Sequence, residues 1–385
     1  MRAHLERVVS LFLNILLHVI IGAISTTMRR IWRGKAQHPA WSATREIVHG
    51  ASRRVLVYAG ELFDRDPLSY AAWTTISEVG AILPVKLGLW SHNLAFRYFS
   101  ADGVKCAAVF KRSSTDLVAQ ILAGGGTCHP SLIFVCHFHG GGYVAGGLVS
   151  AKGTGIDLFT HGVGHHDPLL DRIVTVHVDY TLGVDQRYPR AVQDGVKVFD
   201  WLVTHGGVLG SQIFLYGESG GGGLAACVML ALRDDPFNFL NRDRCQQPAA
   251  VILFSPMITT DHEYPYSTEL EGLDIINGRL ARGCSRMYCG SKDTTSPYAT
   301  PIHAPHLGSL PPILLQTGEL EIFDEPCRQF AEKCMRDGTK VQYEPYEAMV
   351  HCFQGMASVG CPYAKKAYDS MYSFIDEHAP QLQGS

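Results

Sequence analysis

The apolar residues of the C-terminal part of the chain fall into short runs separated by polar stretches. From about Phe96 onward, runs of strand length alternate with stretches compatible with helices: VKCAAVF, LIFVCHF, IVTVHV, QIFLYG, AVILFS, PILLQTG and VQYEPY. Most of these runs are almost continuously apolar, as expected of strands that are covered on both faces. The pattern therefore predicts an α/β fold over residues 96–385, with a mostly parallel central sheet flanked by helices.

A longer apolar run lies at the N-terminus. The eighteen residues from Val8 to Ser25 carry no formal charge, and arginines flank them on both sides. As a helix this run would span about 27 Å, close to the thickness of the hydrocarbon core of a bilayer. We expect residues 1–35 to form a retained membrane anchor. Cleavage as a signal peptide, which would make the protein secreted, is the alternative, but the basic cluster just downstream argues against it.

Three polar residues interrupt the N-terminal run at intervals of four. Ser10, Asn14 and His18 would therefore form one stripe on the helix. A spanning helix with a side that faces a partner would explain the stripe, as would a helix that lies in the membrane interface. A buried helix of a soluble protein is the third interpretation. The heavier positive charge after the run would leave the body in the cytosol. We expect localisation at a membrane, that of the endoplasmic reticulum.

Residues 36–95 are rich in aromatic residues, are compatible with helices and contain no chemical motif, so they are predicted to form a cap or lid. Composition adds little to this outline. The net charge of −3 and the pI of about 6.6 give no electrostatic footprint for nucleic acid. The eleven cysteines form no C-x-x-C pair, which favours buried thiols over disulfides or zinc ligands. The histidines His139, His161, His165 and His166 lack the spacing of a metal-binding helix and are interpreted as solvated.

One motif carries chemistry. Gly217-Glu218-Ser219-Gly220-Gly221 stands between a strand-like run and a helical one. This is the context of a G-x-S-x-G nucleophile elbow, a turn so tight that its flanking glycines must lack side chains while the serine is exposed. A serine hydroxyl attacks only when a base accepts its proton, and the base needs an acid behind it. The motif therefore requires an acid and then a histidine downstream.

Candidates for both follow the last two predicted strands. After PPILLQTG the chain offers four carboxylates: Glu319, Glu321, Asp324 and Glu325. At least two of them are explained by the preference of acidic residues for a helix N-terminus. After VQYEPY there is a single histidine, His351, at the position where this architecture places its base.

A second glycine-rich segment, HFHGGGYVAGG, follows the predicted strand LIFVCHF. Attack by Ser219 on an ester creates a negatively charged oxygen, which backbone N–H groups aimed at it would stabilise by several kcal/mol. Glycines let the backbone approach closely enough. The predicted donors are Gly141, Gly142 and Gly220, and His139 is expected to shape the loop rather than to transfer protons.

Together, HGGGY, GESGG, GELEIFDE and VHCF resemble the hormone-sensitive lipase family of α/β-hydrolase esterases, which includes arylacetamide deacetylase and the fungal steryl acetyl hydrolases. The resemblance covers roughly residues 96–380. It implies Ser219 as nucleophile, His351 as base and Glu321 as acid, with Asp324 as the alternative acid, and a cap built from N-terminal helices. Gly220 and Gly223 depart from the Ala and Asn that the family usually has at these positions.

These observations predict a membrane-tethered serine carboxylesterase or deacetylase that hydrolyses short-acyl esters of an apolar molecule. No metal or organic cofactor is expected. An acyltransferase would use the same triad and would differ only in the acceptor of the acyl group. A non-catalytic ligand receptor on the same fold, like the gibberellin receptors, is the third possibility, although those receptors lack the triad histidine.

Overall fold

The computed structural model describes residues 2–33, 41–65, 73–76, 82, 86–124, 130–149, 151, 158–159, 161, 167–240, 246–290, 294–359 and 361–380. Its centre is an eight-stranded sheet with the order β1-β2-β4-β3-β5-β6-β7-β8. The strands are β1 (Leu94–Ala101), β2 (Val104–Lys111), β3 (Ile133–Phe138), β4 (Ile173–Val178), β5 (Ile213–Glu218), β6 (Ala250–Phe254), β7 (Ile313–Gly318) and β8 (Val341–Tyr346). The pairs β1–β2 and β2–β4 are antiparallel, and the other neighbours are parallel.

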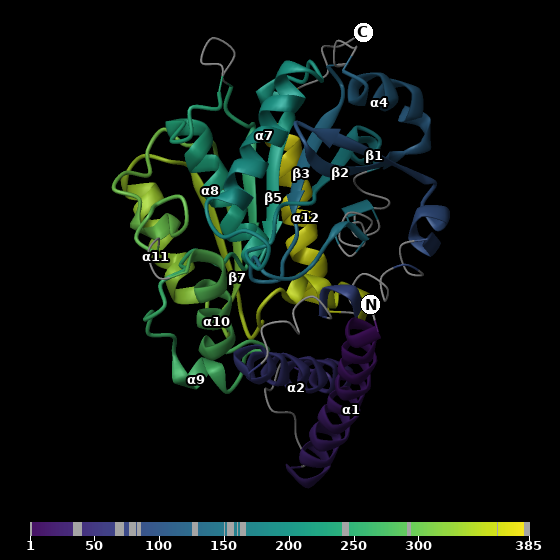
Figure 1. Cartoon of the computed structure of the whole chain (residues 1–385), viewed down its shortest axis with the longest axis vertical. Helices are drawn as coiled ribbons and strands as arrows, with labels where there is room; N and C mark the ends of the chain where they lie inside the picture. The colour runs from purple at the N-terminus through teal and green to yellow at the C-terminus, as the bar shows by residue number, and fades with distance from the viewer. Residues whose placement is uncertain are drawn as a thin grey trace.

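Helices cover both faces of the sheet (Figure 1). Their bounds are α1 (Arg2–Arg33), α2 (Ala43–Arg65), α4 (Thr115–Leu122), α6 (Asp167–Leu170), α7 (Arg190–Thr204), α8 (Gly220–Asp234), α9 (Thr268–Glu271), α10 (Gly278–Cys289), α11 (Asp324–Arg336) and α12 (Pro362–His378). Short 3-10 helices lie at Arg112–Ser114, Gly210–Gln212, Pro301–His303 and Phe353–Val359.

Alternation along the strands divides the core into two layers. In β3, Phe134 and Cys136 belong to the layer under α4, α7, α8 and α11, whereas Ile133 and Val135 belong to the layer under α6 and α12. All six residues of β3 are buried, as are those of β4 and β7. Burial on both faces explains why these strands read as nearly unbroken apolar runs. The predicted α/β fold with a mostly parallel sheet is confirmed.

The sheet starts at Leu94, just inside the segment 36–95 that the sequence assigns to a cap. Within that segment α2 packs against α10 and α1. A small apolar cluster joins Ala59 of α2 to Val144, Ala145 and Cys284 of the body. The division of the chain at residues 35 and 95 stays a prediction.

Of the loop histidines, His165 and His166 lie outside the described residues. His161 was expected to be solvated, but its ring packs at 4.7 Å from the ring of Tyr368. None of the nine cysteines within the described ranges forms a disulfide, and all but Cys352 are buried.

The helix α1 has the length and composition of a membrane span over Val8–Arg33, with a mean hydropathy of 2.3 in its most apolar window. A signal sequence would have the same properties.

Candidate active site

The serine of the predicted elbow occupies a tight turn between β5 and α8. Ser219 has φ 56° and ψ −125°, a backbone conformation that side-chain-bearing residues rarely adopt. The flanking glycines are required by close contacts: a Cβ on Gly221 would lie 2.0 Å from the carbonyl oxygen of Phe138, and one on Gly217 would lie 2.2 Å from the carbonyl oxygen of Gly221. The sequence motif is therefore a real strand-turn-helix elbow in the fold.

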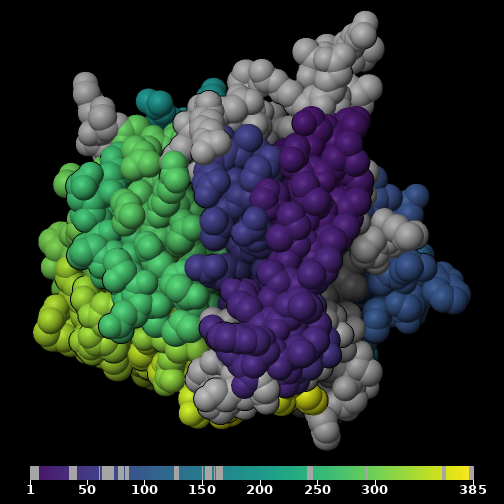
Figure 2. All heavy atoms as spheres, turned by 90° about the horizontal axis from the view of Figure 1, so that it is seen from below, coloured from purple at the N-terminus to yellow at the C-terminus, as the bar shows by residue number. Residues whose placement is uncertain are grey.

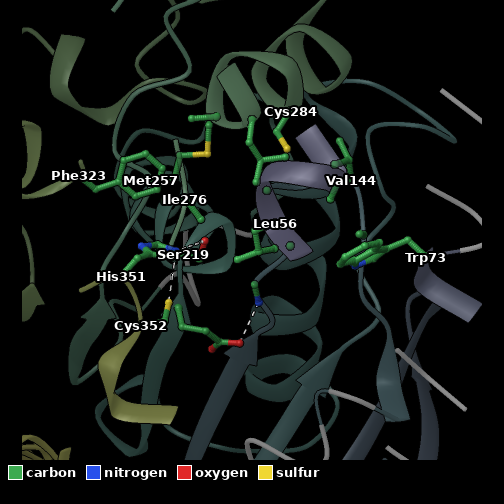
Figure 3. Close-up of a pocket in the computed structure, with 18 residues that line it drawn as sticks. Leu56, Trp73, Val144, Ser219, Met257, Ile276, Cys284, Phe323, His351 and Cys352 are labelled. Carbon is green, nitrogen blue, oxygen red and sulfur yellow. Dashed lines mark hydrogen bonds between the residues drawn. The ribbon is translucent and has the colours of Figure 1, made fainter. Parts of the chain in front are cut away.

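His351 lies on the loop after β8 and reaches the serine. Its Nε2 is 2.9 Å from Ser219 Oγ, within hydrogen-bond distance (Figure 3). Burial lowers the pKa of His351 from 6.5 to about 4, and the nearby Asp274 carboxylate opposes that shift. A histidine with this pKa is neutral near pH 7, which is the form that can accept a proton from a hydroxyl.

Of the candidate acids, Glu321 is the one whose carboxylate contacts the imidazole. Its Oε2 is 3.6 Å from His351 Nδ1, slightly beyond hydrogen-bond distance, and accepts a hydrogen bond of 2.6 Å from Ser255 Oγ. The Glu321 side chain is fully buried, and this burial raises its pKa well above the usual range. Among the described residues, His351 Nδ1 and Glu321 Oε1 have no hydrogen-bond partner. A small approach of the two side chains would satisfy the imidazole N–H.

The alternative acid, Asp324, is engaged elsewhere. Its Oδ1 accepts hydrogen bonds of 2.7 Å from both Thr317 Oγ1 and Tyr343 Oη at the N-terminus of α11. These contacts connect β7 to β8 and give Asp324 a structural explanation.

A further carboxylate, Asp274, lies behind the histidine loop and was missed by sequence reasoning. Its Oδ1 accepts the N–H of His351 at 3.0 Å, and its Oδ2 accepts the N–H of Ile322 at 2.9 Å. Asp274 is completely buried, and desolvation raises its pKa to about 7. It joins the two loops that carry His351 and Glu321. Nothing in the surrounding sequence, EGLDIING, signals this role.

The glycine loop after β3 lies directly beside the elbow. Gly141 and Gly142 have φ values of 116° and 60°, and a Cβ on Gly220 would lie 2.9 Å from the Gly142 nitrogen. The backbone of the three predicted donors thus comes together at Ser219. His139 is buried rather than solvated, and its ring stacks at 4.4 Å on the ring of Tyr180, which follows β4.

A row of buried polar side chains runs through the sheet beneath this loop. Glu218 accepts the N–H of Gly140 at 2.8 Å on one oxygen and contacts His137 Nε2 at 2.7 Å with the other. The Nδ1 of His137 is 2.8 Å from that of His177 on β4, whose Nε2 is 3.1 Å from Thr175 Oγ1. These contacts hold Gly140, at the start of the glycine loop, against Glu218, the residue before the nucleophile. The sequence indicated them only by placing one histidine inside each of two apolar strands.

A cavity of about 260 Å³ opens over Ser219 (Figure 3). The cap and the body both line it, chiefly with apolar side chains; these include Leu56, Trp73, Val144, Met257, Ile276 and Phe323. Within the described ranges, no three His, Cys, Asp or Glu side chains gather as metal ligands would.

The fold is that of an α/β hydrolase. A family model described as the alpha/beta hydrolase fold matches residues 135–355, and the chain belongs to that family. The chain is 29% identical over 233 residues to the esterase LipI of Mycobacterium tuberculosis, which covers 58% of this chain and 67% of LipI. It is 27% identical over 241 residues to an acetyl-hydrolase of Streptomyces hygroscopicus, which covers 62% of this chain and 74% of the relative.

Solved structures agree on the fold. An esterase from the bacterial hormone-sensitive lipase family superimposes with a TM-score of 0.61 at 21% identity, over 79% of this chain and 98% of its own. The predicted resemblance to this family is confirmed. The names of the relatives support the predicted class of enzyme, a carboxylic ester hydrolase.

Proposed function

We propose that the protein is a serine carboxylesterase or deacetylase that acts through Ser219, His351 and Glu321. The observation that carries the proposal is the 2.9 Å contact between Ser219 Oγ and His351 Nε2 on a strained elbow, with a buried carboxylate on the far side of the ring. A nucleophile, a base within reach of it and a group that orients the base are the three parts that acyl transfer requires.

The reaction proceeds in two symmetrical halves. His351 Nε2 takes the proton of Ser219 as Oγ bonds to the ester carbonyl carbon, and the carbonyl oxygen becomes an oxyanion. The N–H groups of Gly141, Gly142 and Gly220 stabilise that oxyanion, and the loss of one such donor typically slows an enzyme by about 10²- to 10³-fold. The intermediate collapses, and the leaving alcohol takes the proton from His351. Water then attacks the acyl-serine by the same route and releases the acid.

The contacts around the His351 ring favour Glu321 over Asp324 as the acid of the triad. It is the candidate whose carboxylate lies 3.6 Å from His351 Nδ1, whereas Asp324 is occupied by two hydroxyl donors. The positive charge that forms on the imidazole during attack favours an ionised Glu321, so the interaction is strongest in the transition state. Asp274 acts on the backbone N–H of His351 and holds the loop.

The cavity favours an apolar substrate with a small acyl group. Leu56, Ile276 and Phe323 line a space of about 260 Å³, at the small end of ligand pockets, above Ser219. A sterol or another hydrophobic alcohol that carries an acetyl group fits this chemistry, and the relative named an acetyl-hydrolase supports the short acyl chain. The N-terminal helix would hold the enzyme at a membrane, where such esters concentrate. Location at the endoplasmic reticulum stays a prediction.

The test is covalent labelling of the full chain with a fluorophosphonate probe, together with hydrolysis of p-nitrophenyl acetate. Ser219→Ala should abolish both signals, and Ser373→Ala, on the exposed face of α12, should leave both unchanged. A non-catalytic receptor would stay unlabelled. Full turnover by the Ser219→Ala enzyme would refute the proposal. Product analysis with a competing alcohol would identify an acyltransferase, because the acyl group would then appear on that alcohol.

A further inference from the structure

The helix α1 shows the reverse of the polarity expected for a soluble protein. Among the residues that it buries are the small or polar Gly22 and Thr26, together with Leu11. Most of its large apolar side chains point outward with 38% to 88% of their surface exposed: Val9, Phe12, Leu13, Leu16, Leu17, Val19, Ile20, Ile24, Met28, Ile31 and Trp32. A helix on the surface of a soluble domain turns its apolar stripe to the core instead. So large an exposed apolar face marks a surface that contacts something other than water.

The inner side of α1 packs lengthwise against α2 in antiparallel order. The ring of His18 stacks at 4.1 Å on Tyr58, and a Cβ on Gly22 would lie 2.8 Å from the Cα of Ala51. His18 belongs to the polar stripe of the sequence, and this stripe therefore has α2 as one of its neighbours.

The packing continues toward the C-terminal end of α1. A Cβ on Gly50 would lie 1.9 Å from Thr26 Oγ1, and Arg30 Nη1 forms a 2.6 Å salt bridge with Glu46. In each such pair the residue number rises along α1 as it falls along α2. From His18 to Arg30 this contact extends over roughly 18 Å of helix.

The second helix is in turn held by the hydrolase body. Arg45 Nη2 donates a hydrogen bond to the Ala348 carbonyl at 2.5 Å, and Trp41 Nε1, just before α2, donates to the same carbonyl at 2.9 Å. His49 Nε2 lies 2.6 Å from the Leu273 carbonyl oxygen, and Arg53 Nη2 donates to the Glu271 carbonyl at 2.9 Å. Rotation of α1 away from the body would therefore break its own contact with α2 or carry α2 with it.

From this packing we propose that α1 lies in the plane of the membrane surface and does not cross the bilayer. The occupant of its outer face is lipid, and the hydrolase body rests on the same side of the membrane as both ends of the helix. Figure 2 shows α1 extended along one face of the molecule beside α2. Crossing the bilayer with α2 attached would bring Arg53 and Arg54 into hydrocarbon, at a cost of about 3 kcal/mol or more for each charge.

Charge at the end of the helix fits a lipid surface. Arg29 and Arg33 are exposed beside the apolar face, and basic residues near anionic headgroups contribute about 1 kcal/mol each. An apolar face with a basic border is the pattern of helices that lie in the interface. Leu56 and Ala59 of α2 line the cavity over Ser219, so a single helix separates the lipid from the site. The idea that substrate passes from the lipid to Ser219 beside α2 depends on the proposed function. The idea that α1 binds the lipid surface does not.

The decisive experiment is a protease-protection assay on the full chain with one epitope tag at each end, translated in the presence of microsomes. An in-plane helix leaves both tags on one side, so both should be digested together without detergent. Protection of one tag with digestion of the other would show a spanning helix. Loss of the N-terminal tag by cleavage, with the body protected, would show a signal peptide. Either of these results overturns the proposal.

A second measurement tests the lipid-facing side directly. Leu13→Glu with Ile24→Glu should reduce flotation with phosphatidylcholine–phosphatidylserine vesicles at least tenfold. The matched control, Leu209→Glu with Met335→Glu, alters similarly exposed apolar side chains elsewhere and should float like the wild type. Hydrolysis of p-nitrophenyl acetate in detergent should be unchanged in both, which separates loss of docking from loss of activity. Unchanged flotation of the α1 variant, or dimers without vesicle binding, would contradict the proposal.

Discussion

Replacement of Glu321 by Gln is the sharpest test of how the site works. The exchange keeps the size of the side chain and removes the carboxyl group whose ionised form would lie 3.6 Å from His351 Nδ1 when the imidazolium forms. At an effective dielectric constant of about 20, the attraction between the ionised carboxylate and the imidazolium formed during attack is roughly 4 to 5 kcal/mol. Both side chains are buried, so solvent screens the pair little. We expect kcat to fall by about three orders of magnitude, with little change in KM.

The control for this experiment is Asp324→Asn, the other acid that the sequence offers. Its oxygen can still accept from Thr317 and Tyr343, and we expect a kcat close to that of the wild type. The assay is steady-state hydrolysis of p-nitrophenyl acetate, normalised to the fraction of enzyme that a fluorophosphonate probe labels. If Glu321→Gln kept more than a tenth of the wild-type kcat, Glu321 would not be the acid. A large loss in Asp324→Asn alone would identify that residue instead.

The remaining predictions concern the elbow, its support and pH. Gly221→Ala should yield no soluble folded protein by circular dichroism, because its Cβ would meet a backbone oxygen at 2.0 Å, whereas Gly355→Ala has open space and should fold. His137→Leu removes a partner of Glu218 and should lower kcat about tenfold through the glycine loop without raising KM; an unchanged kcat would contradict this. Because the pKa of His351 falls from 6.5 to about 4 on folding, its contribution to stability is present above pH 6.5 and is lost as the pH falls through 4. In urea unfolding, the wild type should therefore lose about 3 kcal/mol relative to His351→Gln over that interval, and a constant difference would refute the shift.

The sheet and the candidate residues Ser219 and His351 could be predicted from the sequence, because their signals are local. Apolar runs such as LIFVCHF identify buried strands by period and length, and all seven predicted runs fall on strands. The serine stands in a turn that only glycines permit on either side. The position of His351 followed from its place after the final strand.

The rest depends on packing between segments that are distant in sequence. Asp274 reaches the histidine loop across 77 residues, and His137 meets His177 across 40. A buried carboxylate or histidine has no local signature that tells where its partner lies. The choice between Glu321 and Asp324 likewise needs the hydrogen bonds of each. The antiparallel contact of α1 with α2 could not be predicted from hydropathy, because hydropathy describes the composition of one helix and not the segment against which it packs.

The buried cysteines affect how the enzyme loses activity on heating. Burial raises the pKa of Cys106, Cys227 and Cys327 well above the usual range, so the folded protein keeps them as unreactive thiols. An unfolded chain would expose all of them at once with ordinary acidity, and air oxidation would then link them in non-native pairs. Thermal inactivation should therefore be a one-way process whose rate, rather than an equilibrium midpoint, sets the working lifetime. If a reductant is present during heating, activity should return when the protein is cooled.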